Sequence, residues 1–163
     1  MDAHKGVQAR FPDGVELSVL HPAGSDIERS AGEEEQNEES VVAEVKFGKT
    51  SMLLTGDAGC EAEAKILARG ANLRADVLKV GHHGSSSALT ESFLRAVHPK
   101  IAVISVGRRN QFGHPSRETL VRLKRTHVRT YRTDLDGTLT METDGETLRV
   151  RQSRIPYWLR ARR

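Results

Sequence analysis

The sequence predicts a mixed α/β layer structure. Short apolar runs alternate with helix-like apolar stripes through the middle of the chain, and the last third is rich in strand-like segments around Asp144-Gly145. The predicted order is β, ββ, α, β, α, β, α, βββ, with no internal repeat. Strand–helix alternation favours a parallel sheet, and a closing meander adds antiparallel strands.

The first third of the chain contains a strand, a long polar segment and a hairpin. The predicted strands span residues 15–20, 41–47 and 51–55, the last two joined at Gly48-Lys49. Residues 22–39 are rich in Gly, Ser and Glu and are expected to form a mobile acidic loop.

The remainder alternates helices and strands. Helices are predicted over residues 60–69 and 88–97, and from the cap Ser116 to about residue 125. Strands are predicted over residues 76–80, 101–106, 128–133, 138–143 and 147–151. We expect residues 15–20 and 41–55 to share one sheet. Residues 77–80 and 101–106 are expected to be parallel neighbours in a second sheet.

Composition limits the classes of protein to consider. The chain has 163 residues, 37% of them hydrophobic and 29% charged, which suits one globular domain. No apolar run approaches the roughly 20 residues that span a bilayer, and residues 1–11 do not resemble a signal peptide. The single cysteine, Cys60, excludes a disulfide within the chain. Residues 151–163 form a basic tail, interpreted either as solvated or as a contact for phosphate or anionic lipid.

Three polar segments follow predicted strands, where α/β sheets place their ligands. Asp57 follows Thr55-Gly56 and either points into a cleft or caps the next helix. His82 and His83 lie between two glycines, as metal and acid–base groups or as a solvated turn. His114 precedes Pro115 and either reaches the same edge or is a plain turn residue. Carboxylate with imidazole is a ligand set for zinc or manganese, and a carboxylate can bridge two cations.

The segments LLTGD, ADVLKVGHHGSSS, HPKIAVISVGRRNQFGHPS and VRTYRTDLDGTLTMETDGETLRV occur in this order. Together they closely resemble the metallo-β-lactamase-like domain at the C-terminal end of the ComEC competence channel proteins and of stand-alone relatives. The resemblance covers residues 14–150. It implies an αββα sandwich, a hydrolase with two divalent cations, and a phosphodiester or DNA substrate in competence-type DNA uptake.

The resemblance also assigns roles to the candidate residues. Asp57 matches the metal-bridging aspartate, and the pair His82-His83 matches the segment that supplies a histidine ligand. We favour His83 as the metal ligand and His82 as an acid–base or supporting residue. His114 matches a histidine on the active-site rim. Asp57 and His83 are therefore expected within roughly 5 Å of each other, because each metal–ligand bond is about 2 Å long.

Departures from the family pattern limit the expected activity. The family's first metal motif, a His-x-His/Asp-x-Asp-His run, has no match in residues 1–57, and Ser116-Arg117 stands where a second His-Pro is common. We therefore expect a C-terminal half to two-thirds of the domain in residues 1–150, with one cation or none firmly bound. The expected partners are DNA or another phosphodiester, and an upstream half that supplies the missing ligands. In the family, the domain is attached to a bacterial inner-membrane channel. The alternative is a non-catalytic nucleic-acid-binding or structural remnant.

Overall fold

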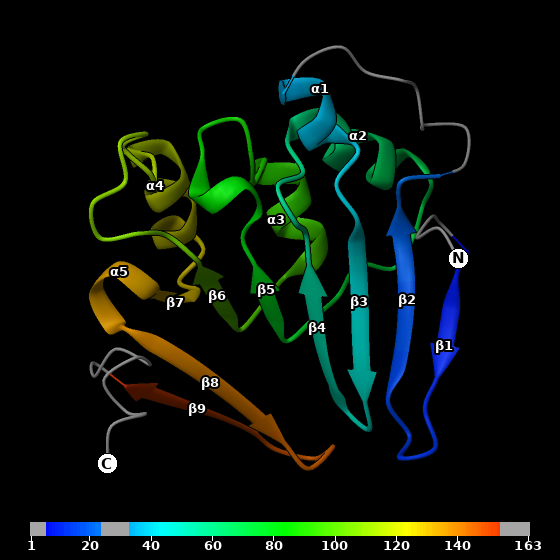
Figure 1. The fold of residues 1–163 in the computed structure, drawn as a ribbon. Helices are drawn as coiled ribbons and strands as arrows, with labels where there is room; N and C mark the ends of the chain where they lie inside the picture. The colour runs from blue at the N-terminus through cyan, green and yellow to red at the C-terminus, as the bar shows by residue number, and fades with distance from the viewer. Residues whose placement is uncertain (1–5, 24–32, 154–163) are drawn as a thin grey trace.

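One seven-stranded mixed sheet organises the described part of the chain. The computed structural model describes residues 6–23 and 33–153. The strands are β1 (Gln8–Arg10), β2 (Glu16–His21), β3 (Val42–Phe47), β4 (Thr50–Leu54), β5 (Val77–Lys79), β6 (Ile101–Ile104) and β7 (Arg129–Arg132). They lie side by side in chain order (Figure 1). The strands from β1 to β4 pair antiparallel, and those from β4 to β7 pair parallel.

The predicted pairing of β5 and β6 is confirmed, but the predicted division into two sheets is wrong. β5 and β6 are parallel neighbours, with Leu78 opposite Ala102. β5 also pairs with β4, with Leu53 opposite Leu78, so all these strands share one sheet. The helix α2 (Cys60–Ala68) leads from the end of β4 to β5. Such a crossover places the next strand parallel to the last one in the same sheet.

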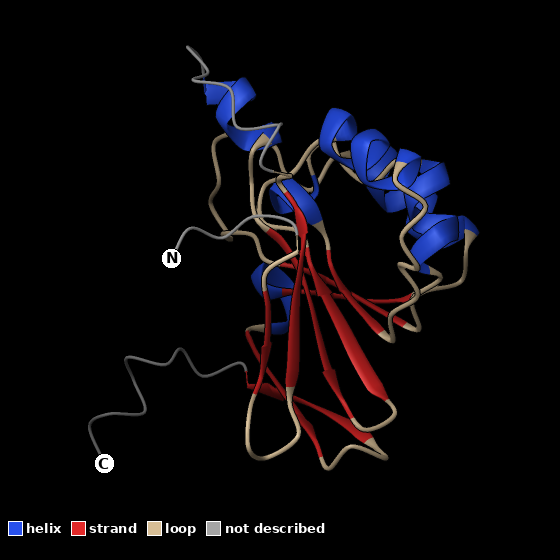
Figure 2. Ribbon diagram, turned by 90° about the vertical axis from the view of Figure 1, so that its right-hand side faces the viewer, coloured by secondary structure: helices blue, strands red, loops and turns tan. Residues whose placement is uncertain are grey.

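Three helices cover one face of the sheet: α2, α3 (Glu91–Val97) and α4 (Arg117–Arg125) (Figure 2). The predicted cap Ser116 is confirmed, because its hydroxyl accepts a hydrogen bond from the backbone N–H of Thr119. Thr90 caps α3 in the same way. No helix in residues 6–23 and 33–153 is long and apolar enough to cross a membrane.

The core lies between these helices and the sheet. Leu53, Leu78, Ala102 and Ile104 point to the helix-covered face and are completely buried. Burying a leucine or isoleucine side chain contributes about 1.5–3 kcal/mol, so this layer holds the parallel half of the sheet together.

A separate two-stranded sheet crosses the opposite face. It is the hairpin of β8 (Thr138–Thr143) and β9 (Leu148–Ser153), which follows the short helix α5 (Thr133–Asp136). The backbone N–H of Lys49 donates to the Gly145 carbonyl at 2.6 Å. The hydroxyls of Thr50 and Thr143 lie 2.9 Å apart. The tip of the hairpin is therefore fixed to the β3–β4 turn.

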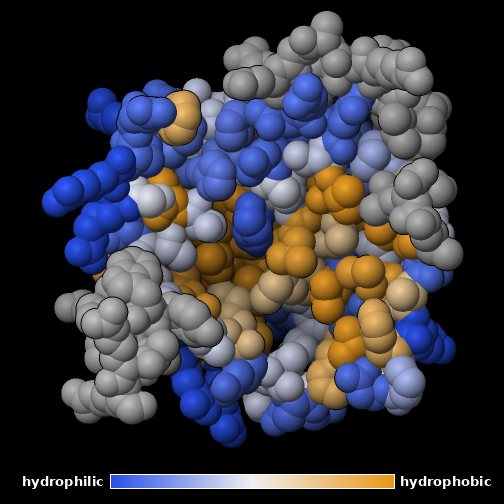
Figure 3. Space-filling view, in the orientation of Figure 1, coloured by the Kyte–Doolittle hydropathy of each residue, from blue (hydrophilic) through white to orange (hydrophobic). Residues whose placement is uncertain are grey.

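The face below this hairpin is apolar and only partly covered. A hollow of about 1020 Å³ lies there, lined by apolar side chains that include Met52, Leu54, Val103 and Met141. Met52 and Leu54 are half-buried, whereas Leu53 between them is completely buried on the other face. Figure 3 shows apolar side chains gathered on this side of the molecule. The two faces of the sheet thus differ in how well they are covered.

Several boundaries differ from those expected. The helix α1 (Glu33–Glu38) lies inside the predicted acidic loop 22–39, whose residues 24–32 are outside the described residues. Glutamate is a good helix former, and Glu38 accepts a hydrogen bond from the Ala62 N–H at 2.6 Å, which ties α1 to α2. β9 spans Leu148–Ser153, whereas a strand over residues 147–151 was expected, and residues 154–163 of the predicted tail also lie outside the described part.

Candidate functional site

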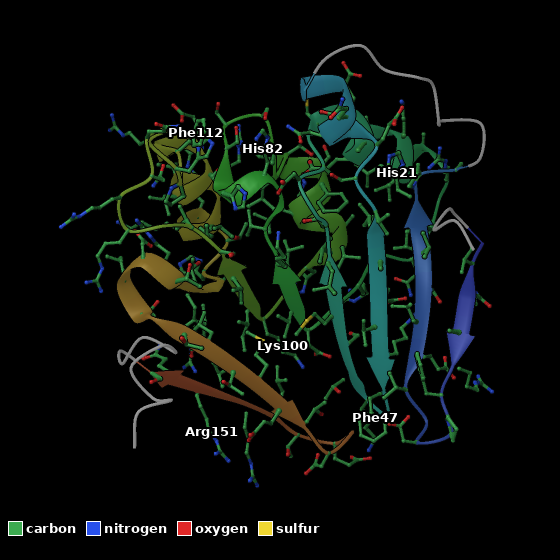
Figure 4. The ribbon with its side chains drawn as sticks, in the orientation of Figure 1. His21, Phe47, His82, Lys100, Phe112 and Arg151 are labelled. Carbon is green, nitrogen blue, oxygen red and sulfur yellow. The ribbon has the colours of Figure 1, made fainter. Side chains whose placement is uncertain are left out.

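Three loops meet at the carboxyl edge of the parallel strands. They follow β4, β5 and β6, which are parallel neighbours, so their carboxyl ends lie side by side. These loops contain all the site residues that the sequence predicted: Asp57, His82, His83 and His114. Figure 4 shows His82 and Phe112 near this edge.

Asp57 does not cap the helix that follows it. The cap of α2 is Gly59, and no side chain makes a capping hydrogen bond there. The left-handed backbone of Gly56, with φ of +55°, turns the chain just before Asp57. The Asp57 N–H donates to the Ser40 hydroxyl at 3.1 Å, which fixes the backbone of the turn and leaves the carboxylate at the edge.

The two adjacent histidines lie in a strained turn. His82 and His83 both have left-handed backbones, with φ of 44° and 53°. That conformation costs a residue with a side chain roughly 1–2 kcal/mol. The flanking glycines are required, because a Cβ on Gly81 would meet the Ala58 carbonyl oxygen at 2.6 Å and one on Gly84 would meet the Pro115 Cβ at 2.7 Å. Strain of this kind is typical of functional sites.

Asp57 and His83 converge, as predicted. The His83 Nε2 lies 3.7 Å from an Asp57 carboxylate oxygen. The His83 Nδ1 lies 2.7 Å from the Ser105 carbonyl, to which it donates when protonated. This hydrogen bond orients the ring and leaves Nε2 as the free ligand atom, the arrangement usual for metal-bound histidines. The expected distance is confirmed, and the role of the two residues as metal ligands stays a prediction.

His82 and His114 extend this pair into a row of rings. The rings of His82 and His83 are 6.5 Å apart between centroids, and those of His82 and His114 are 5.7 Å apart. Burial lowers the pKa of His114, and the charges of His82 and His83 lower it further. His114 is therefore neutral near pH 7 and able to accept a proton. His114 thus lies next to His82, and its role as a rim residue stays a prediction.

Lys79 is a site residue that sequence reasoning did not single out. Its ammonium donates to the Gly56 carbonyl at 3.0 Å. Burial lowers the pKa of Lys79, and the nearby charge of Asp57 partly offsets that effect. The sequence feature that could have identified it is a lysine within the short apolar segment VLKV. Lys79 and Ser105 also line the hollow under the β8–β9 hairpin, so the hollow adjoins the histidine row.

The residues at this edge fit part of a metal site. Asp57 and His83 supply two converging donors. Catalytic zinc sites usually have three protein ligands. Among residues 6–23 and 33–153, no group of three His, Cys, Asp or Glu side chains is placed to hold a cation. The described part of the chain therefore does not form a complete centre.

Comparison with known proteins finds competence proteins. The chain is 41% identical over 104 residues to "ComE operon protein 3" of Bacillus subtilis, a match of 64% of this chain and 13% of that protein. It is 33% identical over 149 residues to "Competence protein ComA" of Neisseria gonorrhoeae, covering 90% of this chain and 21% of the relative. "Recombination protein 2" of Haemophilus influenzae is 37% identical over 121 residues, a match of 74% of this chain and 15% of that protein.

The chain therefore spans about a fifth or less of the length of these relatives. No model of a protein family matches it. The aligned regions are 104 to 149 residues long, with 33–41% of their residues identical.

Proposed function

We propose that this ComEC-like competence protein, which spans about a fifth or less of the length of its relatives, carries part of a metal-dependent hydrolase centre. The substrate class is a phosphodiester, with DNA in competence-type uptake as the leading case. One observation carries this proposal: the His83 Nε2 and the Asp57 carboxylate lie 3.7 Å apart while the His83 Nδ1 is held by the Ser105 carbonyl. Two donors in this arrangement are ready to share a cation.

The fold supports the same proposal. A metallo-β-lactamase-like αββα sandwich has two stacked sheets with helices outside. Residues 6–23 and 33–153 form a seven-stranded sheet with helices on one face and a short second sheet across part of the other. We propose that it is the C-terminal half to two-thirds of such a sandwich.

Each residue of the site has a proposed task. Asp57 and His83 hold the cation, zinc or manganese, which supplies an activated water when bound. His114 is neutral near pH 7 and lies 5.7 Å, ring to ring, from His82. In this proposal the two histidines are the acid–base groups of the site. The neutral His114 would accept a proton that the reaction releases. Lys79 holds positive charge beside Asp57.

The missing ligands come, in this proposal, from a separate upstream half. The observation that supports such a partner is the half-covered apolar face, where Met52, Leu54 and Val103 line a hollow next to the site. Parallel strands are normally covered on both faces. A segment packed there would reach the carboxyl edge.

A second candidate is a nucleic-acid-binding domain without catalysis. The observation that favours it is the lack of a third ligand among the described residues. The two candidates differ in what they predict for cation binding at Asp57.

Calorimetry with zinc and with manganese separates these candidates. We expect weak binding of one cation, because two protein ligands are fewer than catalytic sites use. Asp57→Asn and His83→Asn should abolish this binding, since asparagine tolerates the left-handed backbone at residue 83 but is a poor ligand. The matched control is His127→Asn, at an exposed histidine with φ of 56° on another loop.

Either of two results would overturn the assignment. Cation binding that survives both variants would place the site elsewhere, and no binding at millimolar metal would favour the non-catalytic candidate. Two cations bound at submicromolar affinity would refute the conclusion that the centre is incomplete.

A further inference from the structure

The loop after β6 presents an aromatic ring to solvent beside the histidine row. Phe112 is 72% exposed, more than any other large hydrophobic residue in the described part of the chain. An exposed apolar ring gains no hydrophobic stabilisation from folding. Single exposed hydrophobic side chains are common on protein surfaces, but the Phe112 ring also stacks on His114 at the end of the histidine row.

The backbone of this loop is braced, so the position of Phe112 is fixed. The Asn110 side-chain amide donates to the His114 carbonyl at 2.8 Å and to the Gly107 carbonyl at 3.1 Å. Its oxygen accepts from the His114 N–H at 2.8 Å. Phe112 lies between the two ends of this brace and is therefore presented on a closed turn.

One face of the Phe112 ring is already stacked. The rings of Phe112 and His114 are 5.9 Å apart between centroids and tilted by only 18°. His114 in turn lies 5.7 Å from His82. The outer face of Phe112 is left for a planar ligand, at the end of the row that begins with Asp57 and His83. Figure 4 shows Phe112 and His82 at the same edge of the sheet.

The same loop carries positive charge and no acid. Arg108 and Arg109 are both exposed, and residues 105–116 include no Asp or Glu. Arg108 donates to the Asp134 carbonyl at 3.2 Å. Arg109 makes no hydrogen bond or ion pair within the described residues, so its guanidinium can bind an anion.

We propose that residues 107–114 bind single-stranded nucleic acid, with one base stacked on the outer face of Phe112 and a neighbouring phosphate on Arg109. This inference rests on the phosphodiester function proposed above and names its substrate as a single strand. Base–aromatic stacking together with arginine contacts is how proteins bind single strands, and a paired base in a duplex does not expose its face. The next diester would then lie over the histidine row.

The test is fluorescence anisotropy of a labelled oligothymidylate of about 12 nucleotides, with the full chain and a chelator. Phe112→Ala should weaken binding by about 5- to 100-fold, the range for loss of one stacked base. Phe112→Trp should preserve binding. Arg109→Ala should weaken binding and lower the salt slope by about one phosphate contact. The matched control is Phe11→Ala, a 47% exposed phenylalanine on the β1–β2 turn, which should not change affinity.

The opposite results would overturn the proposal. These are no binding by the wild-type chain, equal affinity of Phe112→Ala and wild type, or a loss in Phe112→Trp as large as in Phe112→Ala. A duplex bound as tightly as the single strand would also contradict it. So would a Phe112→Ala defect found only with anionic vesicles, which would make the loop a membrane contact.

The same measurements keep this inference separate from the proposed hydrolase function. Binding is measured with a chelator, so it does not depend on a metal. Phe112-dependent binding without metal-dependent hydrolysis would contradict the proposed hydrolase function and leave the present inference standing. Hydrolysis combined with binding that does not depend on Phe112 would contradict the present inference and leave the proposed hydrolase function standing.

Discussion

The two edges of the parallel strands each carry an aspartate, and the two are held very differently. Asp76, just before β5, accepts hydrogen bonds from the Ser51 N–H at 2.9 Å and the Ser51 hydroxyl at 3.2 Å. Its other oxygen lies 2.8 Å from the Lys100 ammonium, and its side chain is 18% exposed. Asp57, at the opposite edge, is 40% exposed and pairs only loosely with His83 at 3.7 Å. Figure 4 shows Lys100 and His82 at opposite ends of the strands.

This difference indicates what each edge is for. At the amino edge, the acceptor capacity of the carboxylate is used within the fold, which stabilises the start of β5. At the carboxyl edge, the backbone of His82 and His83 is strained while the Asp57 carboxylate keeps unused acceptor capacity. Strain together with spare polar groups is the usual cost of a binding site.

Asp76→Ala should produce the largest effect. The substitution removes a charged acceptor from Lys100 and leaves the Ser51 N–H without its partner. We expect the free energy of unfolding to fall by about 1.5–3 kcal/mol, the range for hydrogen bonds to charged groups. Denaturant titration measures this change. Glu118→Ala, at an exposed acid on α4, is the control and should cost less than about 1 kcal/mol. A loss at Asp76 no larger than that of the control would remove the contrast between the edges.

His82→Gly should act in the opposite direction. Glycine adopts the left-handed backbone of residue 82 without steric cost, so the free energy of unfolding should rise by about 1 kcal/mol. Among the described residues, the His82 ring has one long polar contact, 3.5 Å to the Ser87 hydroxyl, and edge contacts with the rings of His83 and His114 at 6.5 and 5.7 Å, so little is lost with it. Ser92→Gly, within α3, should instead destabilise by about 0.5–1 kcal/mol. If both glycine variants lose stability, the turn is not strained.

The sequence predicted which residues lie at the carboxyl edge better than it predicted the arrangement of the strands in the sheet. A glycine followed by polar residues after an apolar strand is a local signal, and it located Asp57, His82, His83 and His114. The single sheet was missed because pairing between β4 and β5 depends on how α2 packs, which local periodicity does not contain.

Two site features also lay beyond local reasoning. The stacking of Phe112 on His114 and the position of Lys79 beside Asp57 join residues from different loops or strands. The Glu33–Glu38 helix was missed because an acidic run also suits a solvated loop, and its contact with α2 comes from the tertiary fold.

The pH dependence of stability is a further test of how tightly Asp76 is held at the amino edge. Burial alone would raise the pKa of Asp76, but hydrogen bonds from Lys100 and Ser51 outweigh it, and the pKa lies below its ordinary 3.8. A lowered pKa in the folded state stabilises the protein above the unfolded value, and this contribution is lost as pH falls through the folded value. The stability difference between wild type and Asp76→Asn should therefore be full near neutral pH and shrink below about pH 4. A difference that stays constant down to about pH 2 would show that the ion pair does not set it.

The smallest expected effect is that of Asp57→Asn on stability. The carboxylate is 40% exposed, its pairing with His83 is long, and it does not cap α2. Ion pairs this exposed contribute about 0–1 kcal/mol, so the free energy of unfolding should change by less than about 1 kcal/mol. The lost attraction to Lys79 falls within the same limit, since solvent screens a half-exposed charge. Calorimetry of the same sample should show that cation binding is abolished. The edge would then carry a residue that binding requires and folding does not. A stability loss above about 2 kcal/mol, comparable to the loss expected at Asp76, would instead make Asp57 a structural residue and equate the two edges.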